Sequence, residues 1–264
     1  MPSLVGSEMC IRDSASSDYA AQYLAATLQL SPSTTLRSQI GRSAYTYQIP
    51  GPLNDAQFSS DPRQATRSRN FYSPDITVPA LRLEWRDDSG AELTTTLSGV
   101  FGPRESVQFI GFSDTPDAIN PITNEYAPRQ VDIDRFRSVS METRYLRPWT
   151  MNGIEHTASA GAAFARNHMT RRQRGVGTTG TDFDLNVTSL GFPRDIAYRT
   201  VNGAVYFENL FRFRPRWTVT PGLRLEVGRT RMEGDLAYYD PADVVRAVSY
   251  THLRAHETRH DLVC

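Results

Sequence analysis

The sequence predicts an all-β fold, a partial antiparallel up-and-down transmembrane β-barrel of about eight or nine strands. Three observations lead to this class. Apolar and polar residues alternate with a period of two, short and long connections alternate between the runs, and aromatic residues lie near the ends of several runs. Alternation gives a strand one apolar and one polar face. Connections of unequal length are typical of barrels in the bacterial outer membrane.

The composition excludes several other classes. The chain has 264 residues, a formal net charge of zero and 22% charged residues. This balance argues against a strongly basic nucleic-acid binder and against a disordered acidic tail. No run approaches the roughly 18 apolar residues of a spanning helix, and the mean hydropathy is −0.46. All 29 basic residues are arginine.

The two ends of the chain resemble a translated sequencing adapter. Residues 9–14 can be encoded by DNA whose opposite strand, in a shifted frame, encodes residues 248–252. The relation continues outward, because the complement of possible codons for residues 4–8 encodes residues 253–257. We therefore predict three segments, which are adapter-derived residues 1–14, a genuine insert at 15–247 and adapter-derived residues 248–264.

This division removes several candidate sites. Both cysteines, Cys10 and Cys264, fall in the adapter-like ends, so we expect no disulfide, thiolate metal site or cysteine nucleophile. His252, His256 and His260 have the spacing of a metal-binding helix face, but the adapter accounts for the same letters. We expect both natural ends to be missing, so the lack of a signal peptide carries no information.

Four predicted hairpins account for the main runs. The clearest run covers residues 217–229, and residues 201–213 precede it with the same alternation. Residues 214–216 form a tight link between them, because Pro215 cannot extend a ladder. The other hairpins join 24–30 to 36–40, 81–86 to 93–97, and 139–145 to 154–164, through links at 31–33, 87–90 and 148–153. No segment has a convincing amphipathic helical pattern.

Long connections occupy residues 48–78, 113–130, 171–198 and 233 onward. An up-and-down meander places all of them at one end, and loops beyond about 15 residues are usually functional. The charged face of the strands suits either bulk solvent or an enclosed lumen, so alternation alone leaves both open. The one-sided loops favour the barrel, as does an interfacial girdle formed by Trp149, Phe211, Phe213 and Trp217.

Two segments carry a family resemblance. In residues 207–226 a strand is followed by threonines, Pro221-Gly222 and an arginine two residues before Glu226. The second segment, residues 47–70, contains Pro50-Gly51-Pro52 and Asp61-Pro62-Arg63. Both resemble TonB-dependent outer-membrane receptors of the ferric-citrate-transporter-like branch, although the family's usual aromatic before the glutamate is Leu225 here. The resemblance extends over most of residues 18–240.

The resemblance implies a plug inside a 22-stranded barrel and energised import of an iron chelate, either ferric citrate or another siderophore. It implies the TonB–ExbB–ExbD system as partner and the bacterial outer membrane, with its lipid and lipopolysaccharide, as location. Neither plug nor TonB box is present in the chain, and about nine strands cannot close such a barrel, so we interpret the insert as an internal fragment. Alone in water it is expected to aggregate.

No catalytic set is visible in the insert, so we expect no enzymatic activity, no cofactor and no metal site. Its two histidines, His156 and His168, lack a serine–carboxylate pattern. We expect His156 to be a lumen, interface or packing residue. Residues 175–180 fit a G-x-G-x-x-G string, but no helix follows to hold a pyrophosphate, so we expect a flexible loop apex.

Arginines in the long connections are the candidate ligand-binding residues. Ferric citrate and related chelates are anionic, and guanidinium groups bind carboxylates through paired, charge-assisted hydrogen bonds. The two predicted clusters are Arg63, Arg67 and Arg69 in the first long connection, and Arg171, Arg172 and Arg174 in the third. Contact with lipopolysaccharide phosphates, or simple solvation of the loops, is the alternative for both clusters.

Other functions remain open at this point. A passive outer-membrane channel or adhesin would share the alternation and the loops. A soluble carbohydrate-binding β-sandwich would share the alternation alone. An outer-membrane hydrolase is disfavoured because no nucleophile set is present. A nucleic-acid partner is not expected.

Overall fold

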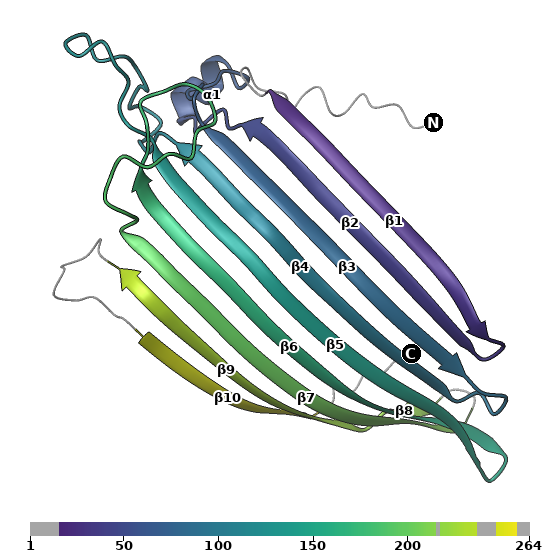
Figure 1. Cartoon of the computed structure of the whole chain (residues 1–264). Coiled ribbons are helices and arrows are strands. Elements are labelled where there is room, and N and C mark those ends of the chain that lie inside the picture. The colour runs from purple at the N-terminus through teal and green to yellow at the C-terminus, as the bar shows by residue number, and fades with distance from the viewer. Residues whose placement is uncertain (1–15, 215–216, 237–246, 258–264) are drawn as a thin grey trace, which may run out of the picture.

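The computed structural model describes residues 16–214, 217–236 and 247–257, and these form one antiparallel sheet. The hydrogen-bonded order is β1-β2-β3-β4-β5-β6-β7-β9-β10, and β8 pairs with β7 beside this path. Strands adjacent in the chain are adjacent in the sheet, which confirms the predicted up-and-down meander (Figure 1). Among the described residues, no helix is long and apolar enough to cross a membrane.

The strands are long. Their bounds are β1 Ser17–Ser31, β2 Thr34–Gln48, β3 Phe71–Arg86, β4 Glu92–Gln108, β5 Gln130–Met151, β6 Ile154–Val176, β7 Arg194–Arg214, β8 Trp217–Val219, β9 Gly222–Leu236 and β10 Ala247–Glu257. A six-residue helix, α1 (Asp55–Ser60), follows β2. Asn54 caps α1, because its side chain accepts from the Gln57 backbone N–H at 2.9 Å while the Gln57 side chain accepts from the Asn54 N–H.

The pairing register keeps like side chains on one face across the sheet. Leu24 lies opposite Ile40, Leu97 opposite Met141, and Met141 opposite Phe164. We define the apolar face as the one that carries Leu24, Ile40, Leu81, Leu97, Met141, Phe164, Val205 and Leu225. The polar face carries Arg82, Thr96, Glu142, Tyr206, Arg224 and Glu226. A period of two is therefore maintained over the whole sheet.

The apolar face is more exposed than the polar face. On β9, Leu223 and Val227 are 52% and 54% exposed, whereas Arg224 between them is only partly exposed. Polar side chains cover one another, as where the Tyr206 hydroxyl donates to Glu142, two strands away, at 2.8 Å. A second sheet against the apolar face, which a β-sandwich requires, does not occur in the described part of the chain.

Two predicted turns are confirmed and a third lies elsewhere. Pro32 and Ser33 separate β1 from β2, and residues 87–91 separate β3 from β4. The link predicted at 148–153 is wrong in extent, because β5 continues through Pro148 and turns only at Asn152 and Gly153, whose φ angles are 52° and 76°. Pairing with β4 ends at Leu146, so β5 has one unpaired edge at Pro148, where a residue without an N–H is tolerated.

The run predicted at 217–229 is interrupted at Pro221. The structure divides it into β8 and β9, because Pro221 has no N–H to donate to the ladder. The pairing with β7 nevertheless continues in step, with Phe211 opposite Val219 and Glu208 opposite Gly222. The Pro221 carbonyl accepts from the Asn209 N–H at 2.9 Å. The predicted link at 214–216 lies partly outside the described residues.

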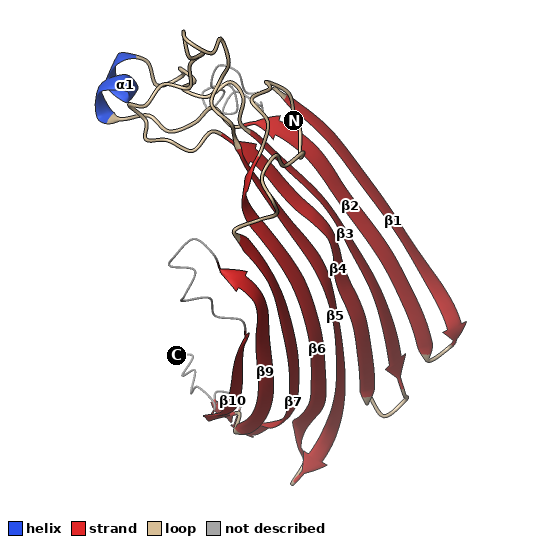
Figure 2. Cartoon of the chain, turned by 60° about the vertical axis from the view of Figure 1, so that its left-hand side comes forward, coloured by secondary structure: helices blue, strands red, loops and turns tan. Residues whose placement is uncertain are grey.

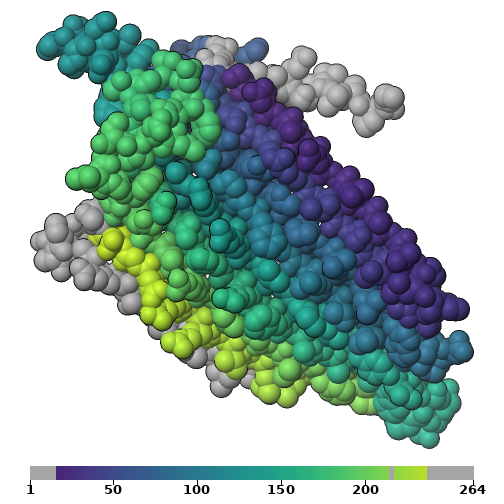
Figure 3. All heavy atoms as spheres, in the orientation of Figure 1, coloured from purple at the N-terminus to yellow at the C-terminus, as the bar shows by residue number. Residues whose placement is uncertain are grey.

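Three long loops lie at one end of the sheet, as the sequence predicts (Figure 2). They cover residues 49–70, 109–129 and 177–193. The first and third are shorter than predicted because β3, β6 and β7 extend beyond the expected runs, whereas the second begins earlier than the predicted 113–130. The ends of β3, β6 and β7 next to the loops are polar, so the alternation cannot be recognised there from the sequence. In the space-filling view the loop at 177–193 lies against the sheet end, while part of the loop at 109–129 projects away (Figure 3). Most of the connection predicted from residue 233 onward lies outside the described residues.

Strand β10 covers residues that we predict to be adapter-derived. It pairs with β9 from Ala247 opposite Glu233 to Glu257 opposite Leu223. An open strand edge offers backbone donors and acceptors to any extended segment, so the pairing is independent of the origin of these residues. The boundaries at 14/15 and 247/248 therefore stay predictions, and residues 1–15 and 258–264 lie outside the described structure.

Candidate functional site

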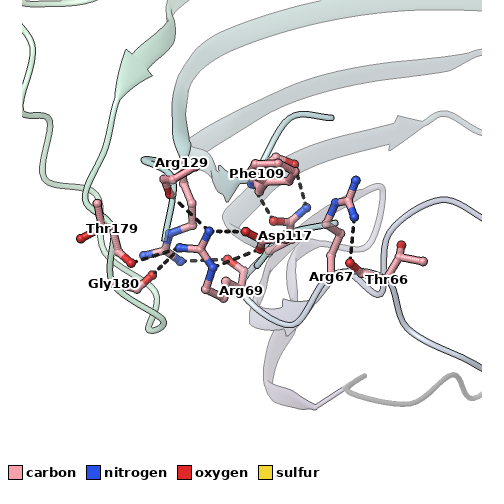
Figure 4. Close-up of polar contacts among 10 residues, drawn as sticks. Thr66, Arg67, Arg69, Phe109, Asp117, Arg129, Thr179 and Gly180 are labelled. Atoms are coloured by element: carbon pink, nitrogen blue, oxygen red, sulfur yellow. Dashed lines mark hydrogen bonds and ion pairs between the residues drawn. The ribbon is translucent and has the colours of Figure 1, made fainter. Parts of the chain in front are cut away.

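The loop end of the sheet is held together by buried arginines. The Arg69 side chain is 1% exposed and contacts both other loops (Figure 4). Its Nε donates to Asp117 Oδ2 at 3.0 Å, and its Nη1 donates to the carbonyls of Thr179 and Gly180 at 3.1 and 3.0 Å. The guanidinium also lies over the Tyr126 ring, 4.0 Å from the centroid. One side chain thus joins loops 49–70, 109–129 and 177–193.

Arg129 and Arg67 strengthen this junction. Arg129 donates to the carbonyls of Arg69 and Asp182, both at 2.8 Å. Its burial, followed by the positive charge of Arg69, lowers its pKa from the usual value. Arg67 donates to the carbonyls of Gly111 and Phe112 at 3.2 and 2.7 Å. Carbonyl groups that would otherwise be unpaired under the loops are therefore satisfied by guanidinium groups.

The glycine-rich string 175–180 is an anchored part of this junction, which differs from the expected flexible apex. Gly175 and Gly177 are buried, and the Thr179 and Gly180 carbonyls accept from Arg69. A Cβ atom on Gly177 would lie 2.7 Å from Val131 Cγ2 and 2.9 Å from the Arg129 carbonyl oxygen. The glycine is needed for this close approach rather than for mobility.

The two predicted arginine clusters are not formed as clusters. Arg67 and Arg69 are 2% and 1% exposed, and their contacts lie within the loops, whereas Arg63 is exposed after α1. Arg171 and Arg172 lie on β6 rather than in a loop, so they point to opposite faces of the sheet. Arg172 pairs with Asp195 at 3.3 Å. Arg174 is exposed, and its backbone N–H donates to Asp132.

Arg171 belongs to a charged cluster on the polar face just below the loops. Its Nε and Nη2 donate to the two oxygens of Asp134, both at 3.0 Å, and Arg104 donates to the same carboxylate from β4. Asp134 is nearly fully buried, whereas the Arg104 and Arg171 side chains keep 39% and 26% exposure. Arg104 and Arg171 contribute two positive charges to Asp134, and Asp132 on the same face of β5 adds a second negative charge that acts on Arg171.

Four tyrosines continue this surface across β1, β2 and β3. Ring centroids are 5.8 Å apart for Tyr19 and Tyr45, 5.9 Å for Tyr45 and Tyr47, and 5.6 Å for Tyr47 and Tyr72. Tyr72 and Pro74 occupy successive positions on the same face of β3, and Pro74 pairs with Arg104. The tyrosines and the charged cluster therefore form one continuous surface below the loops, which we call the loop-end surface.

Sequence reasoning missed most of this surface. Arg104, Asp134 and the tyrosines lie in runs that sequence alternation does not distinguish from other strand ends. The alternation in Tyr45-Thr46-Tyr47 is the one local signal that could have indicated a shared aromatic face. Chemically, the loop-end surface offers guanidinium donors and aromatic rings, which suits an anionic ligand. No group of three potential metal ligands occurs among the described residues.

The two histidines lie on the apolar face. His156 is 2% exposed between Trp149 and Phe211, with ring centroids 4.6 and 5.7 Å away, and its Nδ1 accepts from the Arg212 N–H at 3.1 Å. It is a packing residue in the predicted aromatic girdle, where Phe213 also stacks on Phe211. His168 lies near the other end of β6, opposite Arg137 of β5.

Neither a known family profile nor a curated protein sequence matches the chain. Solved structures do match. The ferric citrate transporter FecA aligns with a TM-score of 0.73 and 16% identity over 92% of this chain and 33% of its own. The copper transporter OprC aligns with a TM-score of 0.62 and 12% identity over 93% of this chain and 35% of its own. The ferric-catecholate import receptor Fiu from E. coli K12, in its closed form, aligns with a TM-score of 0.59 and 13% identity over 94% of this chain and 40% of its own.

The chain thus spans about a third of the length of FecA and OprC, and two fifths of Fiu. These structures are named as transporters or import receptors, not as enzymes. The matching part is the antiparallel meander with its one-sided loops, which the sequence predicts. This chain has the fold of a segment of the barrel of TonB-dependent outer-membrane receptors.

Proposed function

We propose that the chain forms part of the barrel wall of a bacterial outer-membrane receptor that imports an anionic iron chelate with energy from TonB–ExbB–ExbD. The apolar face lies against lipid, the polar face lines the interior, and the loops face the cell exterior. The observation that carries this proposal is the reversed exposure of the two faces. A soluble sheet buries its apolar face, whereas here that face is the more exposed one.

The dimensions of the apolar face support a bilayer setting. On β7 it runs from Val201 to Phe213, and these twelve steps at about 3.3 Å span roughly 40 Å along the strand. A strand tilt of about 40° reduces this length to roughly 30 Å along the membrane normal. That height matches the hydrocarbon core of a typical bilayer, which is about 30 Å thick.

The loop-end surface is the proposed ligand site. Arg171 and Arg104 offer partly exposed guanidinium groups to a carboxylate ligand, and the tyrosines offer aromatic faces beside them. Of the other predicted residues, Arg63 and Arg174 remain proposed contacts in the loops. Arg67 and Arg69 support the site by holding the loops together. Arg172 forms its ion pair with Asp195 on the apolar face, away from the loop-end surface. FecA is named a ferric citrate transporter, which makes ferric citrate the first ligand to test.

A charge placed on each face tests the membrane setting. Val205 is 54% exposed on the apolar face, and Ser140 is exposed on the polar face. Val205→Arg in the full-length gene product is expected to lower the free energy of unfolding in a bilayer by about 2–4 kcal/mol. Ser140→Arg, the matched control, is expected to change it by less than about 0.5 kcal/mol. Equal and small effects in urea titrations would contradict the lipid-facing assignment.

Binding measurements test the ligand site. In the full-length protein, replacing Arg104 and Arg171 together by glutamine removes both positive charges around Asp134 while keeping polar side chains. We expect radiolabelled ferric citrate to bind about tenfold or more weakly, because paired charge-assisted hydrogen bonds are lost. The double variant Arg37→Gln with Arg82→Gln, on the polar face near the turns, is the control. Unchanged binding in the first variant would remove the loop-end surface as the site.

A further inference from the structure

Asp134 is the shared acceptor of two guanidinium groups in the loop-end surface. Arg104, Asp134 and Arg171 lie directly opposite one another on β4, β5 and β6, which are neighbours in the sheet (Figure 1). The Asp134 carboxylate is buried, at 3% exposure, whereas the side chains of Arg104 and Arg171 are 39% and 26% exposed. A ligand that approaches this wall therefore meets the guanidinium groups and not the carboxylate.

The shared acceptor brings two positive charges close together. Arg104 Nη2 and Arg171 Nη2 both donate to Asp134 Oδ2, at 2.5 and 3.0 Å, so these two nitrogens are at most about 5.5 Å apart, the sum of the two lengths. Like charges at such a distance repel each other, and a released arginine side chain regains rotamer freedom. Without the carboxylate the two guanidinium groups would therefore move apart.

Both guanidinium groups keep donors for a ligand. Arg171 donates to Asp134 through Nε and Nη2, and Arg104 donates through Nη2. Each group has more N–H donors than these, and the described residues accept no other hydrogen bond from either of them. The Arg104 guanidinium also lies over the Phe136 ring, 5.5 Å from the centroid, which restricts its movement. The remaining N–H groups are thus presented to a ligand in a fixed arrangement.

The second acid of the cluster has a different role. The Asp132 carboxylate accepts from the Gln130 side chain at 3.0 and 2.9 Å, and from the Arg174 backbone N–H at 2.8 Å. It accepts no guanidinium N–H from the described residues, and its charge acts on Arg171 without a hydrogen bond. Asp132 therefore lowers the net charge of the cluster, whereas Asp134 determines where the guanidinium groups lie.

The geometry points to Asp134 as a positioning residue of the ligand site, a role that rests on the proposed function. Its carboxylate holds the Arg104 and Arg171 guanidinium groups together, so that the carboxylate groups of one bound chelate contact both. Donors that are already ordered bind more tightly, because the ligand does not have to order them. The arrangement of the two positive charges, and not only their number, then determines how tightly the chelate binds.

Charge and position predict opposite effects of the variant Asp134→Asn. Asparagine has nearly the same shape as aspartate but no negative charge, so the variant makes the site more positive. If only the net charge determined affinity, an anionic chelate would bind this variant more tightly. If Asp134 positions the arginines, the chelate binds the variant more weakly although the site is more positive.

Glu84 provides a matched control on the same face of the sheet. Its carboxylate also lies between two arginines, Arg37 at 3.0 Å and Arg82 at 2.7 Å. This cluster lies near the turns, away from the loop-end surface. Glu84→Gln therefore removes the same charge from the same kind of cluster without touching the proposed ligand site.

The test measures the binding of radiolabelled ferric citrate to the full-length gene product in detergent, over a range of salt concentrations. We expect Asp134→Asn to bind about fivefold to tenfold more weakly than the wild type, because the paired hydrogen bonds from the two guanidinium groups no longer converge. Glu84→Gln is expected to stay within about twofold. The residual binding by Asp134→Asn is expected to fall more steeply with salt, because it depends on net charge.

The salt dependence separates positioning from a merely structural role. A residue that only joined the strands would change the free energy of unfolding and leave the salt dependence of binding as in the wild type. Tighter or unchanged binding by Asp134→Asn would overturn the positioning role. Weaker binding with the wild-type salt dependence, or an equal loss in Glu84→Gln, would overturn it as well.

A second variant covers the case in which Asp134→Asn does not fold. Asp134→Glu keeps the charge but moves the carboxylate by one methylene group, so the shared oxygen is displaced from the two arginines. It is expected to bind ferric citrate about threefold more weakly than the wild type. Binding equal to that of the wild type would contradict a role that depends on position.

These measurements also distinguish a wrong positioning role from a wrong ligand site. If the wild type binds ferric citrate and loses it when Arg104 and Arg171 are replaced by glutamine, while Asp134→Asn binds as the wild type does, only the positioning role is wrong. If the wild type binds no ferric citrate, or both arginines can be replaced without effect, the proposed ligand site is wrong and the positioning role is overturned with it.

Discussion

The Arg69 guanidinium and the Asp117 carboxylate form a two-point ion pair between loops 49–70 and 109–129, and both side chains are at most 2% exposed. The Arg69 guanidinium has further acceptors, because it also donates to three backbone carbonyls, those of Ala127, Thr179 and Gly180. Buried ion pairs of this kind depend on such extra hydrogen bonds. The loops at this end are therefore one connected unit rather than three independent segments.

Removing Arg69 is expected to release the loops without unfolding the sheet. Arg69→Ala leaves the Asp117 carboxylate buried without its partner, which costs about 3–5 kcal/mol. The strands do not depend on this contact, so limited proteolysis of the folded protein is expected to cut loops 109–129 and 177–193 at least about tenfold faster. Arg63→Ala, which removes an exposed arginine of the same loop, is the control. Similar cleavage rates for both variants would show that the junction does not hold the loops.

The turn between β3 and β4 is expected to loosen in acid. Hydrogen bonds lower the pKa of Asp87 below its usual 3.8, first from the Ser89 hydroxyl and then from the Ala91 N–H. A carboxyl with a lowered folded-state pKa contributes stability above its unfolded pKa and loses it as pH falls through the folded pKa. Hydrogen exchange of the Ser89 and Ala91 amides is therefore expected to accelerate, relative to other turns, only below about pH 4.

The variant Asp87→Asn is the control for this pH effect. Asparagine keeps an oxygen acceptor for the turn but does not titrate in this range. Its turn amides are expected to exchange with no additional acid dependence. An acid-induced change of the same size in the Asn variant would assign the effect to another group.

Two glycines are expected to differ strongly in their tolerance of alanine. Gly102 has a φ of 137°, and a Cβ atom there would lie 1.8 Å from the Asp75 carbonyl oxygen. Backbone atoms cannot move aside, so Gly102→Ala is expected to cost about 3 kcal/mol or more of unfolding free energy. Gly153 also has a positive φ, but nothing lies within 4 Å of its Cβ position.

Gly153→Ala therefore serves as the comparison, with an expected cost of about 1 kcal/mol from backbone conformation alone. Urea unfolding of both variants in detergent, followed by tryptophan fluorescence, measures the difference. Equal costs would show that the close approach of β4 to Asp75 is not what requires glycine at position 102.

The hairpins and the faces of the strands were predictable because they depend on local chemistry. A period of two alone predicts the first strand pair, from Leu24, Leu28, Leu36 and Ile40. The composition of residues 87–90 predicts a turn. The roles of the arginines were not predictable in this way. Arg171 and Arg172 are adjacent letters in an arginine-rich stretch, and only the extension of β6 to Val176 places them on opposite faces. Charged residues on both faces hide the period from the sequence.

The sequence by itself determined that the chain forms antiparallel ribbons with one apolar and one polar face, because side-chain alternation is a property of neighbouring residues. Only the tertiary structure decided which arginines are buried among the loops and which lie on the polar or the apolar face of the sheet. Arg69 donates to carbonyls 110 and 111 residues away, and Arg104, Asp134 and Arg171 come together only once β4, β5 and β6 are in register. Such contacts depend on pairing between distant segments, and no local pattern in the sequence records that pairing.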